Sequence, residues 1–167
     1  MPELLAPAVR LHRGWLAAHR EWGPGLHEDG FGLSASDSVE SPAGFAEWVA
    51  ALAKDRAEYR WLVENDQVLG GIALRTEPAG YVERAGHIGF GIRPSARGRG
   101  LATWALNQML PEARRRGLSR VLLVCEAGNL ASARTIERAG GVLEETRQTT
   151  HGPVRRYWIA VERPTSG

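Results

Sequence analysis

Apolar residues at helical spacing predict two helices in the first third of the chain. The first is predicted within residues 3–22 from Val9, Leu11, Trp15, Leu16 and Trp22. A second helix over residues 42–55 is predicted because Ser41 can cap its N-terminus and Pro42 suits its first turn. The intervening residues 23–43 are rich in Gly, Pro, Ser and acidic side chains, which predicts a long loop.

The rest of the chain alternates strand and helix patterns. Strands are predicted at Tyr59–Val63, Gln67–Leu74, Gly86–Arg93, Arg120–Cys125, 142–149 and 154–161. Helices are predicted over residues 100–116 and 130–139, and a loop at Thr76–Ala85. This order predicts a mixed α/β sheet with helices on its faces.

Length and composition indicate one globular domain. The chain has 167 residues, 43% of them hydrophobic and 24% charged, enough for a core without disulfides. No apolar run is long enough to cross a membrane, and the N-terminus lacks the pattern of an export signal. Cys125 is the only cysteine in the sequence, which favours a reducing compartment. We therefore expect a cytoplasmic protein with no membrane partner.

The charge pattern argues against a nucleic-acid partner. The net charge is only +2, and the basic cluster at Arg97 and Arg99 lacks a set of aromatic residues for base stacking. The five histidines are scattered and no paired cysteine accompanies them, so we expect no metal site.

The segment from Gly86 to Ala102 is the most informative one. A predicted strand leads into a loop that carries Gly98 and Gly100, and a predicted helix follows at once. Glycine allows close approach of the backbone to a ligand, and the first N–H groups of a helix favour an anion. We expect these amides to bind phosphate, with Arg97 and Arg99 adding electrostatic attraction.

Two common phosphate-binding motifs do not fit this loop. The P-loop of nucleoside triphosphatases requires a Gly-Lys pair, and no lysine follows Gly98 or Gly100. The dinucleotide fingerprint requires a third glycine, and the sequence has Thr103 at that position. A different phosphate-bearing ligand is therefore expected.

The loop resembles that of the GNAT superfamily of acetyl-CoA-dependent N-acetyltransferases. Its signature, [Q/R]-x-x-G-x-[G/A], is met by Arg97, Gly100 and Ala102. A second stretch resembles the same family through Asn129, Ser132, Glu137, Gly140 and Gly141. The closing Tyr157–Ile159 resembles the last strand of a poorly characterised bacterial branch of that superfamily.

The resemblance implies a mostly antiparallel α/β sheet whose central strands splay apart, with helices on both faces. Residues 1–167 would form one acetyltransferase domain, in which residues 1–57 supply the acceptor side and residues 58–161 the coenzyme-binding core. Acetyl-CoA would be the acetyl donor, with no metal. The residues implied to bind it are Ile92, Arg97, Gly98, Arg99, Gly100, Leu101, Ala102, Asn129 and Ser132.

Acetyl transfer to an amine requires removal of a proton from the amine and stabilisation of an oxyanion. A backbone N–H near Ile92 could stabilise the oxyanion. His87 is a candidate base, because its strand face is expected to meet the ligand and its usual pKa is about 6.5. Glu126 is a second candidate, at the end of the strand opposite the splay, and Glu83 is a third.

The departing thiolate benefits from a proton donor, and family members often use a tyrosine in the last helix. The corresponding residue here is Ile136, so the usual donor is missing. Ser132 and Tyr157 are the candidates to replace it. The missing tyrosine also favours a second hypothesis, a catalytically silent module that binds coenzyme A or acyl-CoA.

The acceptor is expected to be a primary amine on a small molecule or a protein, acetylated directly in a ternary complex. Acidic residues of the predicted loop could attract a cationic amine, namely Glu28, Asp29, Asp37 and Glu40. The run Arg114–Arg116 is either a solvated helix end or a contact to the 3′-phosphate of the coenzyme. We expect a monomer or a homodimer.

Overall fold

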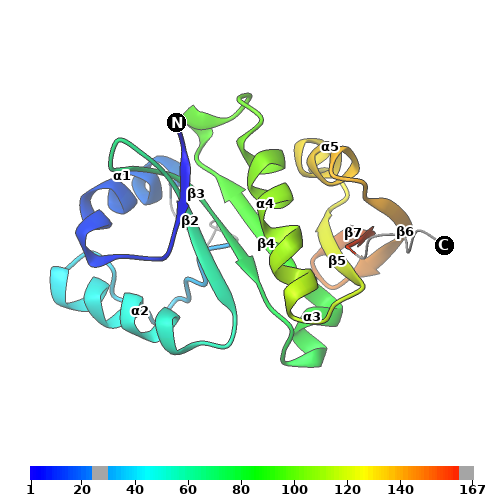
Figure 1. The fold of residues 1–167 in the computed structure, drawn as a ribbon, viewed down its shortest axis with the longest axis horizontal. Helices are drawn as coiled ribbons and strands as arrows, with labels where there is room; N and C mark the ends of the chain where they lie inside the picture. The colour runs from blue at the N-terminus through cyan, green and yellow to red at the C-terminus, as the bar shows by residue number, and fades with distance from the viewer. Residues whose placement is uncertain (24–29, 162–167) are drawn as a thin grey trace.

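The computed structural model describes residues 1–23 and 30–161, which form two antiparallel sheets with helices packed around them (Figure 1). The strands of the first sheet are, in spatial order, β1 (Glu3–Leu5), β2 (Glu58–Glu64), β3 (Gln67–Leu74) and β4 (Ile88–Ile92). Those of the second sheet are β5 (Arg120–Glu126), β7 (Gly152–Ala160) and β6 (Val142–Thr149). The α-helices are α1 (His12–Trp22), α2 (Pro42–Lys54), α3 (Ala79–Ala85), α4 (Leu101–Arg115) and α5 (Leu130–Arg138). Short 3-10 helices cover η1 (Val9–Leu11) and η2 (Pro94–Ala96).

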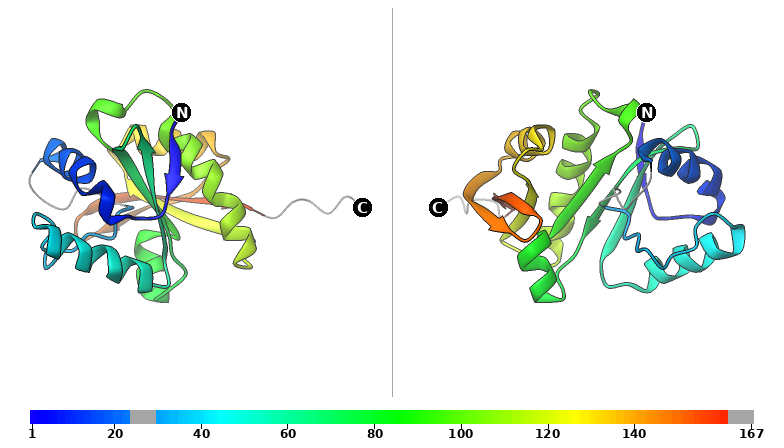
Figure 2. Two further views of the ribbon diagram at one scale, coloured as in Figure 1. Left: turned by 60° about the vertical axis from the view of Figure 1, so that its left-hand side comes forward. Right: turned by 180° about the vertical axis from the view of Figure 1, so that it is seen from behind.

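Helices cover both faces of the first sheet, as the two further views show (Figure 2). Side chains alternate along a strand, so neighbouring residues of β2 face opposite sides. Trp61 packs in an aromatic core with α1 and α2, whereas Leu62 packs in a second core with α4. This arrangement confirms the expected mostly antiparallel α/β fold with helices on both faces.

Capping explains where two of the helices begin. The Ser41 hydroxyl oxygen accepts a hydrogen bond from the Gly44 amide at 3.1 Å, and Pro42 occupies the first position of α2. The Asn129 side chain accepts one from the Ser132 amide at 3.1 Å at the start of α5. The Ser41 cap matches the prediction from sequence.

One strand was missed and one predicted element is wrong. The helix predicted from the spacing of Val9 to Trp22 is present as η1 and α1, but the residues before it form β1, which pairs with the distant strand β2. The predicted loop at Thr76–Ala85 contains the short helix α3, which buries Val82. Within the described residues, no helix is both long and apolar enough to cross a membrane.

Within the described residues, the two sheets are joined by backbone pairing at one place. Gly86 forms an isolated bridge with Leu123, and the His87 amide donates a hydrogen bond to the Leu122 carbonyl at 2.7 Å. From this junction β4 continues toward the loop that carries Gly98 and Gly100, while β5 belongs to the other sheet (Figure 1). The central strands are therefore splayed.

Candidate active site

A cleft of about 1090 Å³ lies between the two splayed strands. Its walls are formed by β4 on one side, and by β5 and α5 on the other. The glycine loop before α4 lines it, as do Arg75 and Tyr81. Arg75 donates a hydrogen bond to the Gly86 carbonyl at 3.0 Å, which places it beside the junction of the sheets. The cleft thus connects the closed junction with the glycine loop.

One edge of β4 faces this cleft with its backbone groups directed away from β3. The Arg93 amide donates to the Leu69 carbonyl at 2.8 Å. In this register the backbone groups of the odd-numbered residues of β4 are the ones that point toward β3. Backbone groups alternate in direction along an antiparallel strand, so the amides of Phe90 and Ile92 point to the cleft. The Ile92 carbonyl already accepts a hydrogen bond from Arg97 Nε at 3.0 Å. An extended ligand could pair with the remaining groups.

The glycine loop is open to an anion. Gly98 and Gly100 have φ of 82° and 73°, and a Cβ added at either would meet no atom within 4 Å. Gly100 is also the N-cap of α4, and no side chain caps that helix. The first turn of α4 lines the cleft, so its unpaired amides are available there, which fits a phosphate or diphosphate.

Most of the residues predicted to bind the coenzyme line this cleft. They are Ile92, Arg97, Gly98, Gly100, Leu101, Ala102, Asn129 and Ser132. The Leu101 side chain is buried in the core, so only its backbone is available to a ligand.

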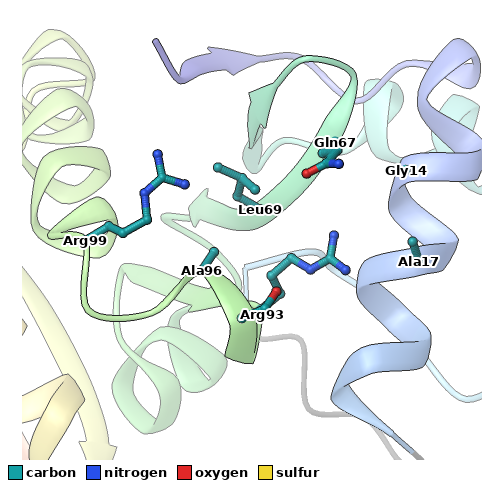
Figure 3. A pocket seen from close by; sticks show the side chains of 8 residues that line it. Gly14, Ala17, Gln67, Leu69, Arg93, Ala96 and Arg99 are labelled. Carbon is teal, nitrogen blue, oxygen red and sulfur yellow. The ribbon is translucent and has the colours of Figure 1, made fainter.

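Arg99 is the exception, because its side chain points away from the cleft. Its guanidinium pairs with Glu64 at 3.1 Å and lines a smaller pocket of about 240 Å³ on the outer side of the loop (Figure 3). Arg93 lies in the same pocket and pairs with Glu21 at 3.0 Å. Arg99 thus links the glycine loop to β2, and Arg93 links the end of β4 to α1.

His87 is held at the sheet junction and is not among the residues that line the cleft. The Leu122 amide donates a hydrogen bond to His87 Nδ1 at 2.8 Å, so this nitrogen carries no proton. Burial, and then the charge of Arg75, lower the pKa of His87. A neutral ring that already accepts a backbone hydrogen bond is a poor proton acceptor for an amine.

Glu126 and Ser132 both line the cleft, and Glu126 is exposed. The other two candidates lie elsewhere. Glu83 pairs with Arg147 at 3.2 Å and with Arg156 at 3.1 Å. Tyr157 is only 1% exposed and packs in the core.

Sequence reasoning missed several residues that the structure brings to the cleft. Tyr81 lies on α3, where the Arg75 guanidinium stands 4.8 Å from its ring centroid. Arg134 and Arg138 lie one turn apart on α5, a spacing that is visible in the sequence. Cys125 also lines the cleft, and burial raises the pKa of its thiol.

Of the four acidic residues that could attract an amine, Asp37 and Glu40 already interact with other residues. Asp37 accepts hydrogen bonds from Ser34, and Glu40 pairs with Arg20 at 2.9 Å. Glu28 and Asp29 lie outside the described residues. Among the described residues, no group of three or more acidic, His or Cys side chains could hold a metal ion.

Comparison with known families decides the family of this chain. The family model described as acetyltransferase (GNAT) domain matches residues 33–142. The chain belongs to the GNAT acetyltransferase family. The match includes the splayed strands, the glycine loop and α5, and the chain is accordingly an acetyltransferase by family. A search of curated proteins finds no significant match.

Solved GNAT structures share this fold at low sequence identity. One is the microcin C7 self-immunity acetyltransferase MccE bound to acetyl-CoA and AMP, with a TM-score of 0.71, 16% identity, and coverage of 95% of this chain and 92% of that one. Another is the ribosomal L7/L12 acetyltransferase RimL with coenzyme A, with a TM-score of 0.73, 18% identity, and coverage of 95% and 93%. A third is the ribosomal-protein-S5-alanine acetyltransferase of Vibrio fischeri, with a TM-score of 0.73, 16% identity, and coverage of 98% and 94%. At these identities the likeness shows the fold.

Proposed function

We propose that this chain transfers the acetyl group of acetyl-CoA directly to a primary amine in a ternary complex. The observation that carries the proposal is the cleft between β4 and β5, which has a free strand edge and an open anion-binding loop. The two amides of the pantetheine arm would pair with that edge, much as an added strand would. The diphosphate would meet the amides of the glycine loop and the N-terminus of α4.

The reaction proceeds by attack of the amine nitrogen on the thioester carbonyl carbon. The C–N bond forms, the C–S bond breaks, and the products are an acetamide and the thiol of coenzyme A. A backbone N–H of Phe90 or Ile92 would stabilise the oxyanion as the carbonyl carbon becomes tetrahedral. Glu126 would accept the amine proton directly or through water, and Ser132 would donate a proton to the thiolate.

The acceptor would be a small-molecule or protein amine. RimL is named for acetylating a ribosomal protein, whereas MccE confers immunity to microcin C7. The acceptor side of the cleft is formed by Trp22, Gly32, Leu33, Arg75 and Tyr81. The aromatic rings of Trp22 and Tyr81 offer a surface on which a flat part of the acceptor could stack, and the Arg75 cation would favour approach of the amine in its neutral form.

The test is a thiol-release assay with acetyl-CoA and a panel of amines. The panel contains peptides with free N-terminal Ser or Ala, an aminoacyl nucleotide analogue, a polyamine and an arylamine. Amine-dependent release with intersecting lines in initial-rate plots supports direct transfer. Parallel lines would indicate an acetyl-enzyme instead and contradict the proposed mechanism.

A second candidate function is a catalytically silent coenzyme-binding module. It is favoured by Ile136, which is 1% exposed and provides no hydroxyl where the family often has tyrosine. Tight binding of acetyl-CoA without turnover of any amine would favour this function over the first.

For its setting, we propose a cytoplasmic protein that needs no metal and acts as a monomer or a homodimer. The lone cysteine and the use of acetyl-CoA support a reducing, metabolically active compartment. Residues 1–167 would then act as a single domain, with residues 1–57 forming the acceptor side.

A further inference from the structure

Strand β6 has a long edge that no other part of the described chain covers. It is the outer strand of the second sheet, and among residues 1–23 and 30–161 it pairs only with β7. All of its residues are exposed, including Val142 at 69% and Leu143 at 48%. In Figure 1 it lies at the end of the molecule away from α1 and α2. An open strand edge of this kind is a template for pairing with another strand.

The register of the second sheet shows which backbone groups of β6 face outward. The Pro153 carbonyl accepts a hydrogen bond from the Ala127 amide at 2.9 Å, beside the end of β5. Odd-numbered residues of β7 therefore direct their backbone groups toward β5, and even-numbered residues direct theirs toward β6. Glu145 and Arg147 lie opposite even-numbered residues of β7, so their backbone groups pair with β7. Thr146, between them, presents its N–H and C=O groups to the outside.

Two copies of β6 can pair around a two-fold axis in a register that suits their charges. Gln148 also faces outward, so antiparallel pairing of the regular part of the strand can be centred on Thr146, on Gln148 or on the residue between them. The register centred on Arg147 sets this residue against its own copy, where like charges repel. The register centred on Gln148 sets Arg147 against a threonine. Only the register centred on Thr146 sets Glu145 against Arg147 of the second copy, and the two-fold axis forms this pair twice.

We infer that β6 pairs with β6 of a second copy around a two-fold axis at Thr146, so that the chain forms a homodimer. The two three-stranded sheets would then join into one continuous sheet. Within one copy Arg147 pairs with Glu145 and Glu83. The side chains of Arg147 and Glu145 are both 44% exposed, so each remains accessible to the opposite charge across the axis. This interface is formed by β6 alone and does not depend on the proposed reaction.

Disulfide cross-linking tests the register. Facing residues of a hydrogen-bonded antiparallel pair have Cα atoms about 5.5 Å apart, a distance that a disulfide spans. In a Cys125→Ser background, Thr146→Cys should therefore give a covalent dimer on mild oxidation. Gln148→Cys is the matched control, because its two copies would lie about 13 Å apart along the paired strands and should not cross-link.

Sedimentation of the full chain over a dilution series tests the charge pairing. Wild type should form a dimer. Glu145→Arg and Arg147→Glu each set like charges opposite one another twice, and each should raise the dissociation constant of the dimer by about tenfold or more. The double variant Glu145→Arg/Arg147→Glu should restore the dimer, because the exchanged charges are again complementary around the axis. Glu47→Arg, a reversal at an exposed residue of α2, should leave the dimer unchanged.

Wild type that sediments as a monomer at every concentration would contradict this interface. A dimer that persists in both single reversals would place the contact on another surface. A double variant that stays dissociated would show that the two charges do not face each other, and equal cross-linking of Thr146→Cys and Gln148→Cys would contradict the register. None of these measurements involves acetyl-CoA, so their failure is distinct from a failure of the proposed function.

Discussion

His87 is a candidate base in the sequence, but its contacts in the structure hold two strands together. Its place beside a glycine-rich strand and its usual pKa favoured a role as base. In the structure its Nδ1 accepts the Leu122 amide, and its own amide donates to the Leu122 carbonyl. His87 therefore fastens β4 to β5 at the end where the cleft closes. A sequence cannot show which side of a strand is paired by a distant strand.

Substitutions of His87 separate these two roles. Removing the acceptor in His87→Ala leaves the Leu122 amide unpaired and should lower the free energy of unfolding by about 1–3 kcal/mol. His87→Asn keeps a side-chain acceptor and should lose less stability, with kcat within about tenfold of wild type. Chemical denaturation and initial rates measure both effects. A fall in kcat of about 100-fold or more in His87→Asn, at unchanged stability, would indicate that His87 is the general base.

At the scale of elements, local patterns were sufficient where neighbours in sequence are also neighbours in space. The hairpin of β2 and β3 and the helices α2, α4 and α5 were predicted within two residues of their ends. Strand β1 has only three residues and exists because of its pairing with β2, which no local pattern reveals. Helix α3 has seven residues with Gly80 in its first turn, a weak helical signal.

The same reasoning predicted the glycine loop but not the residues across from it. The loop depends on a local succession of strand, glycines and helix, which the sequence contains as one segment. The opposing wall, from β5 and α5, meets it only through the tertiary fold. For this reason Arg99 was predicted to face the ligand, whereas Arg134 and Arg138 were missed.

Helix α4 contains a proline that offers a test at this scale. Pro111 is exposed and lies inside the helix, where it removes one backbone hydrogen bond and crowds the preceding turn. Pro111→Ala should raise the free energy of unfolding by about 2 kcal/mol, since a proline costs about 3 and part of that is regained in the unfolded chain. Thermal unfolding measures the change. A lower melting temperature would show that the proline is needed for the packing of α4.

For the whole molecule, one carboxylate joins helix α1 to the segment that leads into the glycine loop. Glu21 accepts a hydrogen bond from Arg93 at 3.0 Å and another from the Ser95 amide at 2.8 Å. The Arg93 hydrogen bond, followed by the Ser95 amide, lowers the pKa of Glu21 to about 2. Helix α1 is thus tied directly to the segment between β4 and the glycine loop.

This tie has a predictable dependence on pH. Because the pKa of Glu21 is lower in the folded chain than in the unfolded one, its stabilising effect is full above about pH 4.5. The effect is lost as the pH falls toward 2. Melting temperatures of wild type and Glu21→Gln should therefore differ at neutral pH and converge as the pH falls from about 4.5 to 2. A constant difference over that range would show that the Glu21 charge is not what stabilises the contact.

The central claim is that acetyl-CoA occupies the cleft with its phosphates on the glycine loop. Thr103 lines the cleft in the first turn of α4, where a glutamate is compatible with the helix dipole but would repel a diphosphate. Gln108 lies on an exposed part of the same helix and serves as the matched control.

The most direct measurement is calorimetric titration of acetyl-CoA into wild type, Thr103→Glu and Gln108→Glu. We predict binding to wild type and to Gln108→Glu with equal affinity, and a loss of at least about tenfold in Thr103→Glu, because like charges in contact cost several kcal/mol. Equal binding by all three proteins would place the coenzyme elsewhere. Absence of binding to wild type would contradict the account as a whole.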